Sequence, residues 1–315
     1  MRRASALLAV PLLGVAALAA GCGSSKPADA NSSVSVSGAF GAAPKVTIPS
    51  ATASPSLYTK TVIGGKGAPL SPTDSFEANY VAYDWSGKTH KLEASSYATH
   101  TKSLFSGQLL PGLSSAMKGA KVGSRVLAVI PPKEGFGPQG NSQLGVKPTD
   151  TLVFVIDVLQ KVGNSATGAH VSNGGGSLPT VSTPAAGQQP TVTVPKSAPP
   201  KNLTSTTLIK GAGDKVTSGE TLLVQYTGVN WRTGKVFDAS YLRHQPLETV
   251  LATSSPQGGV IPGWVKGLSG QTVGSRVMLT IPPSDGYGSK GQPQAGIKGT
   301  DTMVFVIDIL AAIKQ

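Results

Sequence analysis

The C-terminal third of the chain contains a spaced set of aromatic side chains that could bind an apolar ligand. Aromatic residues make up only 5% of the 315-residue chain, yet five of them gather in this region, one directly before an aspartate. The set is Tyr226, Phe237 with Asp238, Trp264, Tyr287 and Phe305. One interpretation is an ordinary hydrophobic core, because aromatic rings bury large areas. The other is an apolar binding cavity with one charged group at its edge.

The residue types do not indicate any other common kind of catalytic site. The four histidines have no HExxH spacing, and the single cysteine excludes an intrachain disulfide, a CxxC pair and a thiolate zinc site. Residues 135–140 and 286–291 fit GxGxxG, but a dinucleotide site needs these glycines to open a helix. Pro138 and Pro293 predict loops instead. The patterns GxSxG and GxxxxGK(S/T) do not occur, so we expect neither a metal nor a cofactor.

The net charge of +12 is spread along the chain rather than concentrated in the folded parts. Residues 73–160 hold eight basic and seven acidic side chains, and residues 219–315 hold eight and six. The excess in the remaining segments would solvate the chain or favour an anionic membrane surface. A nucleic-acid binder would concentrate this charge on one face, among aromatic residues. We therefore expect no nucleic-acid partner.

Two long segments repeat each other at a constant distance along the chain. Residues 122–137 (VGSRVLAVIPPKEGFG) match residues 273–288 (VGSRVMLTIPPSDGYG) with an offset of 151 residues. The same offset relates two further pairs of blocks, 149–159 with 300–310 and 109–112 with 260–263. A register kept over three blocks indicates a tandem duplication of one structural module.

Each copy has the pattern of several strands and one short helix. In the second copy, residues 222–227 alternate with the period of a two-faced sheet. Residues 277–281 and 302–310 are rich in β-branched and aromatic side chains, as strands are. One short helix is expected after Pro262, through Trp264. The pattern predicts an α+β fold for each module, an antiparallel β-sheet wrapped around a short helix.

The N-terminus predicts export. Two arginines precede the apolar run 4–20, as in a secretory signal peptide. Residues 18–22 (LAAGC) resemble the lipobox of bacterial lipoproteins, which implies that residues 1–21 are removed and Cys22 is lipidated. That motif usually has a larger aliphatic residue where Ala19 stands. The alternatives are a secreted protein with an unmodified cysteine and a membrane-spanning helix, which the short run and its proline disfavour.

Composition divides the rest of the chain into four parts. Residues 22–56 and 163–202 are rich in Gly, Pro, Ser, Thr and Ala and poor in large apolar residues. This composition predicts a disordered tether and a disordered linker. Residues 57–162 and 203–315 contain the two copies of the repeat, and we call them the first and the second module.

The second module resembles the FKBP-type peptidyl-prolyl cis-trans isomerases over residues 203–315. The motifs that carry the resemblance are YTG at 226–228, GKVFDAS at 234–240, the R-x-x-P spacing at 243–246, VIPGW at 260–264, VGSR at 273–276, IPP at 281–283, GYG at 286–288 and VFVI at 304–307. The resemblance implies catalysis of X–Pro isomerisation without a metal or cofactor, on proline-containing polypeptides. That family commonly binds macrolides such as tacrolimus and rapamycin, so a macrolide is a further expected ligand.

The resemblance also implies which residues form the binding pocket. The aromatic walls would be Tyr226, Phe237, Trp264 and Phe305. Trp264 would be the floor of the pocket, and Val260 and Ile261 would line it. The backbone N–H of Ile261 would hold a carbonyl oxygen of the substrate.

The polar contacts near the twisting amide would come from Asp238 and Tyr287, with Arg243 orienting the aspartate. Two positions depart from the family pattern. Leu247 stands where the family has a further aromatic residue, and Gln292 stands where it often has a histidine. We expect these departures to change the sequence preference or lower the rate without abolishing activity.

The first module keeps the strand pattern but changes most of the matching pocket residues. The match pairs Tyr80 with Tyr226, Leu92-Glu93 with Phe237-Asp238, Leu109-Leu110 with Val260-Ile261, Leu113 with Trp264, Phe136 with Tyr287 and Phe154 with Phe305. Loss of the indole, the phenol hydroxyl and the short carboxylate predicts weak or no isomerase activity. Peptide binding or a spacer role would remain open to this module, and activity with a different specificity is the alternative.

These features together predict an exported lipoprotein of the bacterial cell envelope, anchored to the membrane. Its second module would be a prolyl isomerase that assists exported proteins, because X–Pro isomerisation is slow enough to limit folding. A second hypothesis is a non-catalytic peptide-binding lipoprotein that uses both modules, and a third is a structural spacer. The presence of Asp238, Trp264 and Tyr287 favours catalysis, since a pure binder could have lost them as the first module has.

Overall fold

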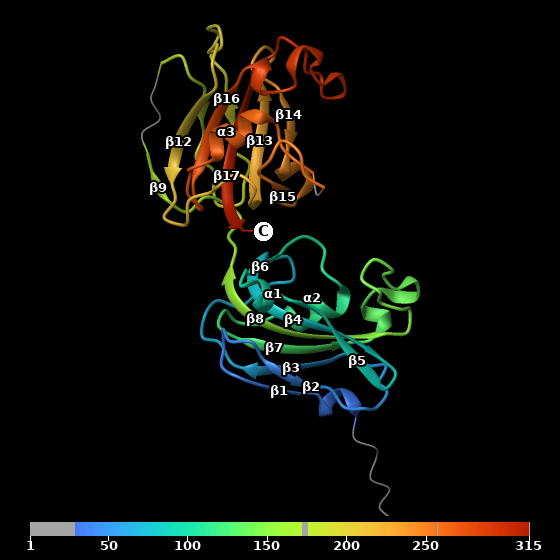
Figure 1. Ribbon diagram of the computed structural model, residues 1–315. Helices are drawn as coiled ribbons and strands as arrows, with labels where there is room; N and C mark the ends of the chain where they lie inside the picture. Colours follow the sequence, from blue (N-terminus) through green and yellow to red (C-terminus); the bar gives the residue numbers. More distant parts are fainter. Residues whose placement is uncertain (1–28, 172–175, 257, 315) are drawn as a thin grey trace, which may run out of the picture.

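The computed structural model describes residues 29–171, 176–256 and 258–314. The predicted signal peptide, residues 1–21, and Cys22 lie outside these ranges. In the part of the chain that is described, no helix is both long and apolar enough to span a membrane. Figure 1 shows two β-rich modules, and the last strand, β17, ends where the two modules meet.

The first module is built on a six-stranded antiparallel sheet. The strand order is β3-β7-β8-β4-β5, and β6 also pairs with β4. The strands are β3 (Tyr58–Ile63), β4 (Phe76–Ser86), β5 (Thr89–Ser95), β6 (Ser103–Phe105), β7 (Arg125–Ile130) and β8 (Thr151–Lys161). The helices are α1 (Ser96–Thr99) and α2 (Pro111–Met117), with 3-10 turns η2 (Pro132–Glu134) and η3 (Gly137–Gln139). Helix α2 packs on the core side of the sheet.

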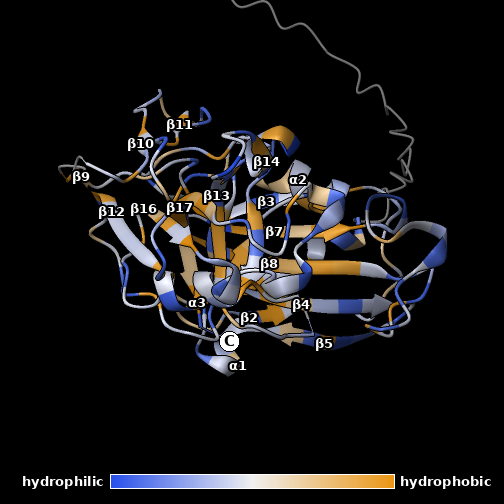
Figure 2. Ribbon diagram, turned by 90° about the horizontal axis from the view of Figure 1, so that it is seen from above, coloured by the Kyte–Doolittle hydropathy of each residue, from blue (hydrophilic) through white to orange (hydrophobic). Residues whose placement is uncertain are grey.

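The second module repeats this arrangement. Its strand order is β14-β13-β17-β16-β12-β9, in which β9 is the short strand Ala169–His170, and β15 also pairs with β13. The strands are β12 (Thr204–Lys210), β13 (Thr221–Asn230), β14 (Val236–Ala239), β15 (Leu247–Val250), β16 (Arg276–Ile281) and β17 (Met303–Ile313). The helices are α3 (Pro262–Leu268) and the 3-10 turns η4 (Ser240–Arg243), η5 (Pro283–Asp285), η6 (Gly288–Lys290) and η7 (Pro293–Ala295). Figure 2 shows apolar residues running along the central strands of both sheets.

Each principal helix begins at a proline and is held close to its sheet by a glycine. Pro111 and Pro262 occupy the first helical turn, where the missing N–H leaves no hydrogen bond unmade. A Cβ atom on the next residue, Gly263, would lie 2.6 Å from Cγ2 of Ile281 on β16, and the matching glycine of the first module is equally confined. The expected antiparallel sheet wrapped around a short helix is therefore confirmed in both modules.

The two GxGxxG stretches are loops, as predicted. Residues 286–291 leave η5, pass through η6 and reach a β-bridge, and residues 135–140 follow the same path in the first module. Neither stretch opens an α-helix, so neither presents a helix N-terminus to a pyrophosphate group.

The prediction of a disordered tether is wrong for residues 29–56. A 3-10 turn, η1 (Ala30–Ser33), leads into a hairpin of β1 (Ser35–Ser37) and β2 (Lys45–Thr47). This segment, blue in Figure 1, covers the face of the first sheet opposite α2. Val34 and Ile48 at its ends are buried against apolar side chains of β4, β7 and β8. We call residues 30–51 strap 1.

A buried ion pair ties strap 1 to the sheet. Arg125, whose side chain is fully buried, pairs with Asp157 at 2.6 Å. The same guanidinium donates to the backbone oxygens of Gly38 and Ala42, and the Asp157 carboxylate accepts from the N–H of Gly41. The turn of the strap, together with the Tyr97 hydroxyl that donates to Asp157 at 2.8 Å, satisfies the remaining hydrogen-bonding capacity of the ion pair, as a buried pair requires.

The prediction of a disordered linker is wrong for parts of residues 163–202. Strand β9 (Ala169–His170) pairs with β12, and β10 (Thr180–Val181) pairs with β11 (Val192–Thr193) in a second hairpin. The apolar side chains of this segment pack on the outer face of the second sheet, and they are Leu178, Val181, Val192 and Val194. We call residues 178–197 strap 2.

Both straps belong to the duplicated unit. The Trp85 indole N–H donates to the backbone oxygen of Ala51 at 3.0 Å, and the Trp231 indole donates to that of Ser197 at 3.1 Å. Both pairs of positions differ by 146 residues. The same offset relates PKVTIP at 44–49 to PTVTVP at 190–195. This offset differs from the 151 residues of the other blocks because the segment between the tryptophan and the main helix is five residues longer in the second module.

Candidate functional site

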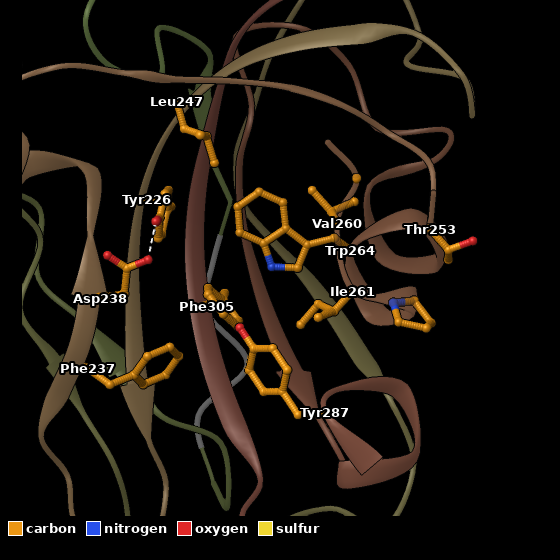
Figure 3. A pocket seen from close by; sticks show the side chains of 12 residues that line it. Tyr226, Phe237, Asp238, Leu247, Thr253, Val260, Ile261, Trp264, Tyr287 and Phe305 are labelled. Carbon is orange, nitrogen blue, oxygen red and sulfur yellow. Dashed lines mark hydrogen bonds between the residues drawn. The ribbon is translucent and has the colours of Figure 1, made fainter. Parts of the chain in front are cut away.

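The second module contains a cavity of about 440 Å3 between β13, β14, β17 and α3. Figure 3 shows the side chains that surround it. Its lining is Tyr226, Phe237, Asp238, Leu247, Thr253, Gly259, Val260, Ile261, Pro262, Trp264, Tyr287 and Phe305. Every residue predicted to catalyse or bind in this module lines the cavity, except Arg243, which reaches it through its contacts with Asp238 and Tyr226. The spaced aromatic set is therefore a cavity wall as well as part of the core.

Three aromatic rings meet edge to face at the base of the cavity. The ring centroids of Trp264 and Phe305 are 5.3 Å apart at 84°, and those of Tyr226 and Trp264 are 5.4 Å apart at 79°. Phe237 meets the other side of Phe305 at 5.5 Å and 89°. Edge-to-face pairs of this kind are the favoured geometry for aromatic rings. Trp264 and Phe305 are each only 4% exposed, so the base is largely apolar, although the buried indole N–H of Trp264 has no hydrogen-bond partner among the described residues.

A hydrogen-bonded trio forms the polar corner of the cavity. The Tyr226 hydroxyl donates to the Asp238 carboxylate, as the dashed line in Figure 3 marks. The Arg243 guanidinium donates to Asp238 at 2.6 Å and to the Tyr226 hydroxyl at 2.7 Å. It also lies 5.6 Å from the centroid of the Tyr226 ring. Arg243 therefore orients the aspartate, as expected.

The environment of this corner keeps both tyrosines protonated. Burial, together with the hydrogen bond to Asp238, raises the pKa of Tyr226 to about 12. Burial and then the charge of Asp238 raise the pKa of Tyr287. Both hydroxyl groups are therefore neutral at physiological pH. The Tyr226 proton is held by Asp238, whereas the neutral Tyr287 hydroxyl can donate a hydrogen bond into the apolar cavity.

The opposite wall offers a backbone donor. The N–H of Ile261 donates to no acceptor among the described residues, because it sits at the N-cap of α3. Val260, the residue before it, donates its own N–H to the backbone oxygen of Ala252. The site thus combines one free backbone donor, one tyrosine hydroxyl and one carboxylate around an apolar floor.

Gly228 permits the aromatic packing on β13. A Cβ atom there would lie 2.8 Å from Cζ of Phe237 and 2.9 Å from Cε1 of Phe305. Contacts under 3.0 Å force one of the rings to move. The Tyr-Thr-Gly order therefore has a structural reason, since the strand must carry Tyr226 inward and still leave space for two rings.

Three lining residues were not among the predicted site residues, and they are Thr253, Gly259 and Pro262. Pro262 belongs to the VIPGW motif and could have been named from it. Thr253 and Gly259 lie between β15 and α3, in a segment that is longer than its counterpart in the first module. They have no matched partner in the repeat, and no residue-type signal singled them out.

No three His, Cys, Asp or Glu side chains in the described ranges are grouped closely enough to hold a metal ion. Comparison with known proteins decides the family. The description "FKBP-type peptidyl-prolyl cis-trans isomerase" matches residues 67–159 and, a second time, residues 213–310. The chain belongs to the FKBP family. The two FKBP matches together cover more than half of the chain and fall in the two modules.

Several FKBP relatives match a stretch about as long as one module. An FK506-binding protein of Streptomyces anulatus is 37% identical over 124 residues, 39% of this chain and 97% of that protein. A probable FK506-binding protein of Corynebacterium glutamicum is 35% identical over 127 residues, 40% of this chain and 99% of that protein. The crystal structure of FkpA from Escherichia coli is 35% identical, covering 35% of this chain and 47% of that one, with a TM-score of 0.31.

The first FKBP module lacks the carboxylate and the arginine of this site. Asp238 pairs with Gly228 across β13 and β14, and the equivalent pair on β4 and β5 is Ala94 with Ala82. The predicted match of Leu92-Glu93 to Phe237-Asp238 is therefore wrong by one residue, and Glu93 takes the place of Phe237. A β-bulge in each hairpin places the extra residue at this point.

Aromatic rings pack together in the core of the first module, beside Tyr80. Phe105 on β6 stacks on Phe76 with centroids 4.9 Å apart and meets Tyr80 edge-on at 5.5 Å. The strand register gives Phe76 and Phe105 the places that Leu222 and Thr249 have in the second module. The exchange of two smaller side chains for two rings explains how the first module packs its core without the indole.

Proposed function

We propose that the second module catalyses cis-trans isomerisation of X–Pro bonds in exported polypeptides and that the first module does not. The single observation that carries this proposal is the joint lining of one cavity by Trp264, Tyr287 and Asp238, each at its family position. In the first module the corresponding positions hold Leu113, Phe136 and Ala94.

The geometry suits this reaction for a physical reason. Amide resonance makes rotation about an X–Pro bond cost about 18–20 kcal/mol. In the twisted transition state that resonance and its charge separation are lost, so an apolar environment favours the twisted form over either planar one. The Trp264 floor would hold the proline ring, while the Ile261 N–H would hold a neighbouring carbonyl oxygen. Asp238, Tyr226 and Arg243 would set the orientation of the chain that leaves the cavity.

The test is an assay of X–Pro peptide isomerisation by the full chain and two pocket variants. Trp264→Ala and Asp238→Ala are each expected to reduce kcat/KM by at least about tenfold, the scale set by a loss of about 1.4 kcal/mol of transition-state stabilisation. The matched control is Leu113→Ala, at the position of Trp264 in the first module, which is expected to leave the rate unchanged. Absence of catalysis by a folded chain would leave a peptide-binding protein, the alternative function.

We propose further that this FKBP is exported and held at the membrane by a lipid on Cys22. The support lies in the arginines, the apolar run and the LAAGC order of residues 1–22. Fatty-acid labelling and membrane fractionation test the anchor, and Cys22→Ser is expected to lose the label and release the protein. Fatty-acid labelling of the Cys22→Ser chain would contradict the proposal that the lipid is on Cys22. A macrolide of the tacrolimus type is the expected small ligand of the cavity, in keeping with the names of the FK506-binding relatives.

A further inference from the structure

Strand β15 presents its two faces to different partners. Side chains alternate between the faces of a strand, and Leu247 on one face lines the cavity of the second module. The next residue, Glu248, points the other way and accepts a hydrogen bond from the Ser106 hydroxyl of the first module. One residue of β15 thus forms the cavity wall while its neighbour contacts the other module.

The first module also contacts the residues just before β15. A Cβ atom on Gly107 would lie 2.6 Å from the side-chain nitrogen of Gln245, so the two segments of the chain lie close together there. A surface hollow near this point is lined by Asp74 and Ser75 of the first module and by His244 and Pro246 of the second. The segment 244–248 therefore lies beside the first module, with Pro246 and Leu247 half-buried and the other three residues exposed.

An apolar cluster secures this junction. Leu104 on β6 packs against Leu223 on β13 and against Leu310 and Ala311 on β17. Leu223 is the residue that pairs with Glu248 across β13 and β15. The apolar contact and the Ser106–Glu248 hydrogen bond therefore act on the same point of the second sheet, directly behind Leu247.

The segment held in this way joins two residues of the site. It begins after Arg243, which orients Asp238, and it ends at Leu247 in the cavity wall. His244, between them, has a left-handed backbone with φ of +53°, a conformation that costs energy in a non-glycine residue. His244 caps η4 by donating its N–H to the backbone oxygen of Tyr241, and His100 has the same φ at the matching cap in the first module, so this turn belongs to each module's own fold.

We propose that the first module is a positioning element for the catalytic module and that it acts through Ser106 on β15 and through Leu104 on the neighbouring strands β13 and β17. This inference rests on the proposed function, since it concerns how the same cavity is shaped. Loss of the contact would let β15 and the segment before it move away from the cavity. Binding of the substrate would weaken because the Leu247 wall and the Arg243 orientation are no longer held in advance.

The experiment uses the full chain and compares Ser106→Ala, Leu104→Asp and the control Ser142→Ala, which alters an exposed loop serine of the first module. We expect KM for an X–Pro peptide to rise about fivefold or more in the first two variants, the lower end of typical coupling between sites, with kcat nearly unchanged. Ser106→Lys, which can pair with the Glu248 carboxylate, is expected to restore KM. Ser142→Ala is expected to match the unsubstituted chain.

Two further measurements separate this proposal from the proposed function. The double variant Ser106→Ala with Glu248→Ala is expected to raise KM no more than either change alone, because both remove one interaction. Hydrogen exchange at residues 247–250 is expected to become faster in Leu104→Asp and Ser106→Ala. If the unsubstituted chain shows no isomerase activity, the proposed function fails, and the dissociation constant for the same peptide replaces KM. An unchanged KM, or an unchanged dissociation constant in that case, overturns the positioning role.

Discussion

Gly228 shows how a single backbone position can decide whether an aromatic cavity forms. Its missing side chain leaves space for Phe237 and Phe305, which a Cβ atom would approach to less than 3.0 Å. In the first module the equivalent residue is Ala82, and the ring of Phe237 is replaced by Glu93. The two differences belong together, because the bulkier strand residue is compatible only with the absence of the ring.

Gly228→Ala is therefore expected to lower both stability and substrate affinity. Forcing a methyl group into this packing costs about 1–3 kcal/mol, and displacement of Phe237 or Phe305 would distort the cavity. Urea unfolding and KM for an X–Pro peptide measure the two effects. Ala82→Gly in the first module is the control and should leave KM unchanged. A folded Gly228→Ala chain with unaltered KM would contradict this role of the glycine.

A pair of carboxyl groups distinguishes the first module from the second at another matched position. Asp84 faces Asp150, and one oxygen of each has no hydrogen-bond partner among the described residues. In the second module the equivalent pair is Asn230 and Asp301, joined by a hydrogen bond of 2.8 Å. Burial and then the negative charge of Asp150 raise the pKa of Asp84 to about 6.

Asp84→Asn is expected to stabilise the first module at neutral pH. The pKa of an unfolded aspartate is about 3.9, so between about pH 4 and 6 the folded chain binds more protons than the unfolded chain. Its stability therefore falls as pH rises through this window. The asparagine removes that loss and should raise the free energy of unfolding by about 1 kcal/mol at pH 7.5. Below pH 4 it should give no gain.

Urea unfolding at pH 3.5 and pH 7.5 distinguishes these outcomes. The reciprocal control is Asn230→Asp, which places the acid pair in the second module and should destabilise it at pH 7.5. If Asp84→Asn raised the free energy of unfolding equally at both pH values, the stabilisation would not come from removing the raised pKa of Asp84.

The residues of the site were predictable from sequence to the extent that motifs carry them. Trp264, Asp238 and Tyr287 stand in motifs whose order is kept, and all line the cavity. The predicted match of Leu92-Glu93 to Phe237-Asp238 failed for a physical reason. A β-bulge adds an unpaired residue to the hairpin, and counting along the sequence cannot show on which side of the bulge a given side chain falls.

At the scale of elements, the straps are the part of the fold that composition concealed. Their Ser, Pro, Gly and Ala content is typical of tethers, yet Val34, Val36, Val46 and Ile48 supply apolar side chains to the outer face of the sheet. The decisive information is long-range, because the strap is stable only when the sheet residues that it covers are themselves apolar. The sheet strands were identified from their own pattern, which did not reveal that both faces are buried.

Ile48→Ala is expected to destabilise the first module by about 2–4 kcal/mol, the range for truncating a buried isoleucine. The free energy of unfolding in urea, followed by circular dichroism, measures this effect. Thr47→Ala, at the neighbouring exposed position of β2, is the matched control and should change little. The isomerase activity of the second module should be similar in both variants. Equal stability of the two variants would mean that strap 1 behaves as a tether.

At the scale of the whole molecule, the duplication has kept one framework and divided the roles. Both modules retain the strap, the buried Arg–Asp pair and the Pro-Gly start of the main helix. The strap and the ion pair stabilise the fold away from the cavity, whereas the helix start contributes Pro262 to its lining. The cavity residues, by contrast, differ together in the first module, where the rings of Phe76 and Phe105 occupy the core.

One ligand site per chain is the consequence that can be measured directly. Calorimetric titration of the full chain with tacrolimus is expected to give a stoichiometry of one, although the chain contains two FKBP matches. Trp264→Ala should abolish this binding, whereas Leu113→Ala at the matched position should leave it intact. A stoichiometry of two would show that the first module opens a cavity despite its packed rings. A single site would agree with the loss of the indole, the phenol hydroxyl and the carboxylate at Leu113, Phe136 and Ala94 of the first module.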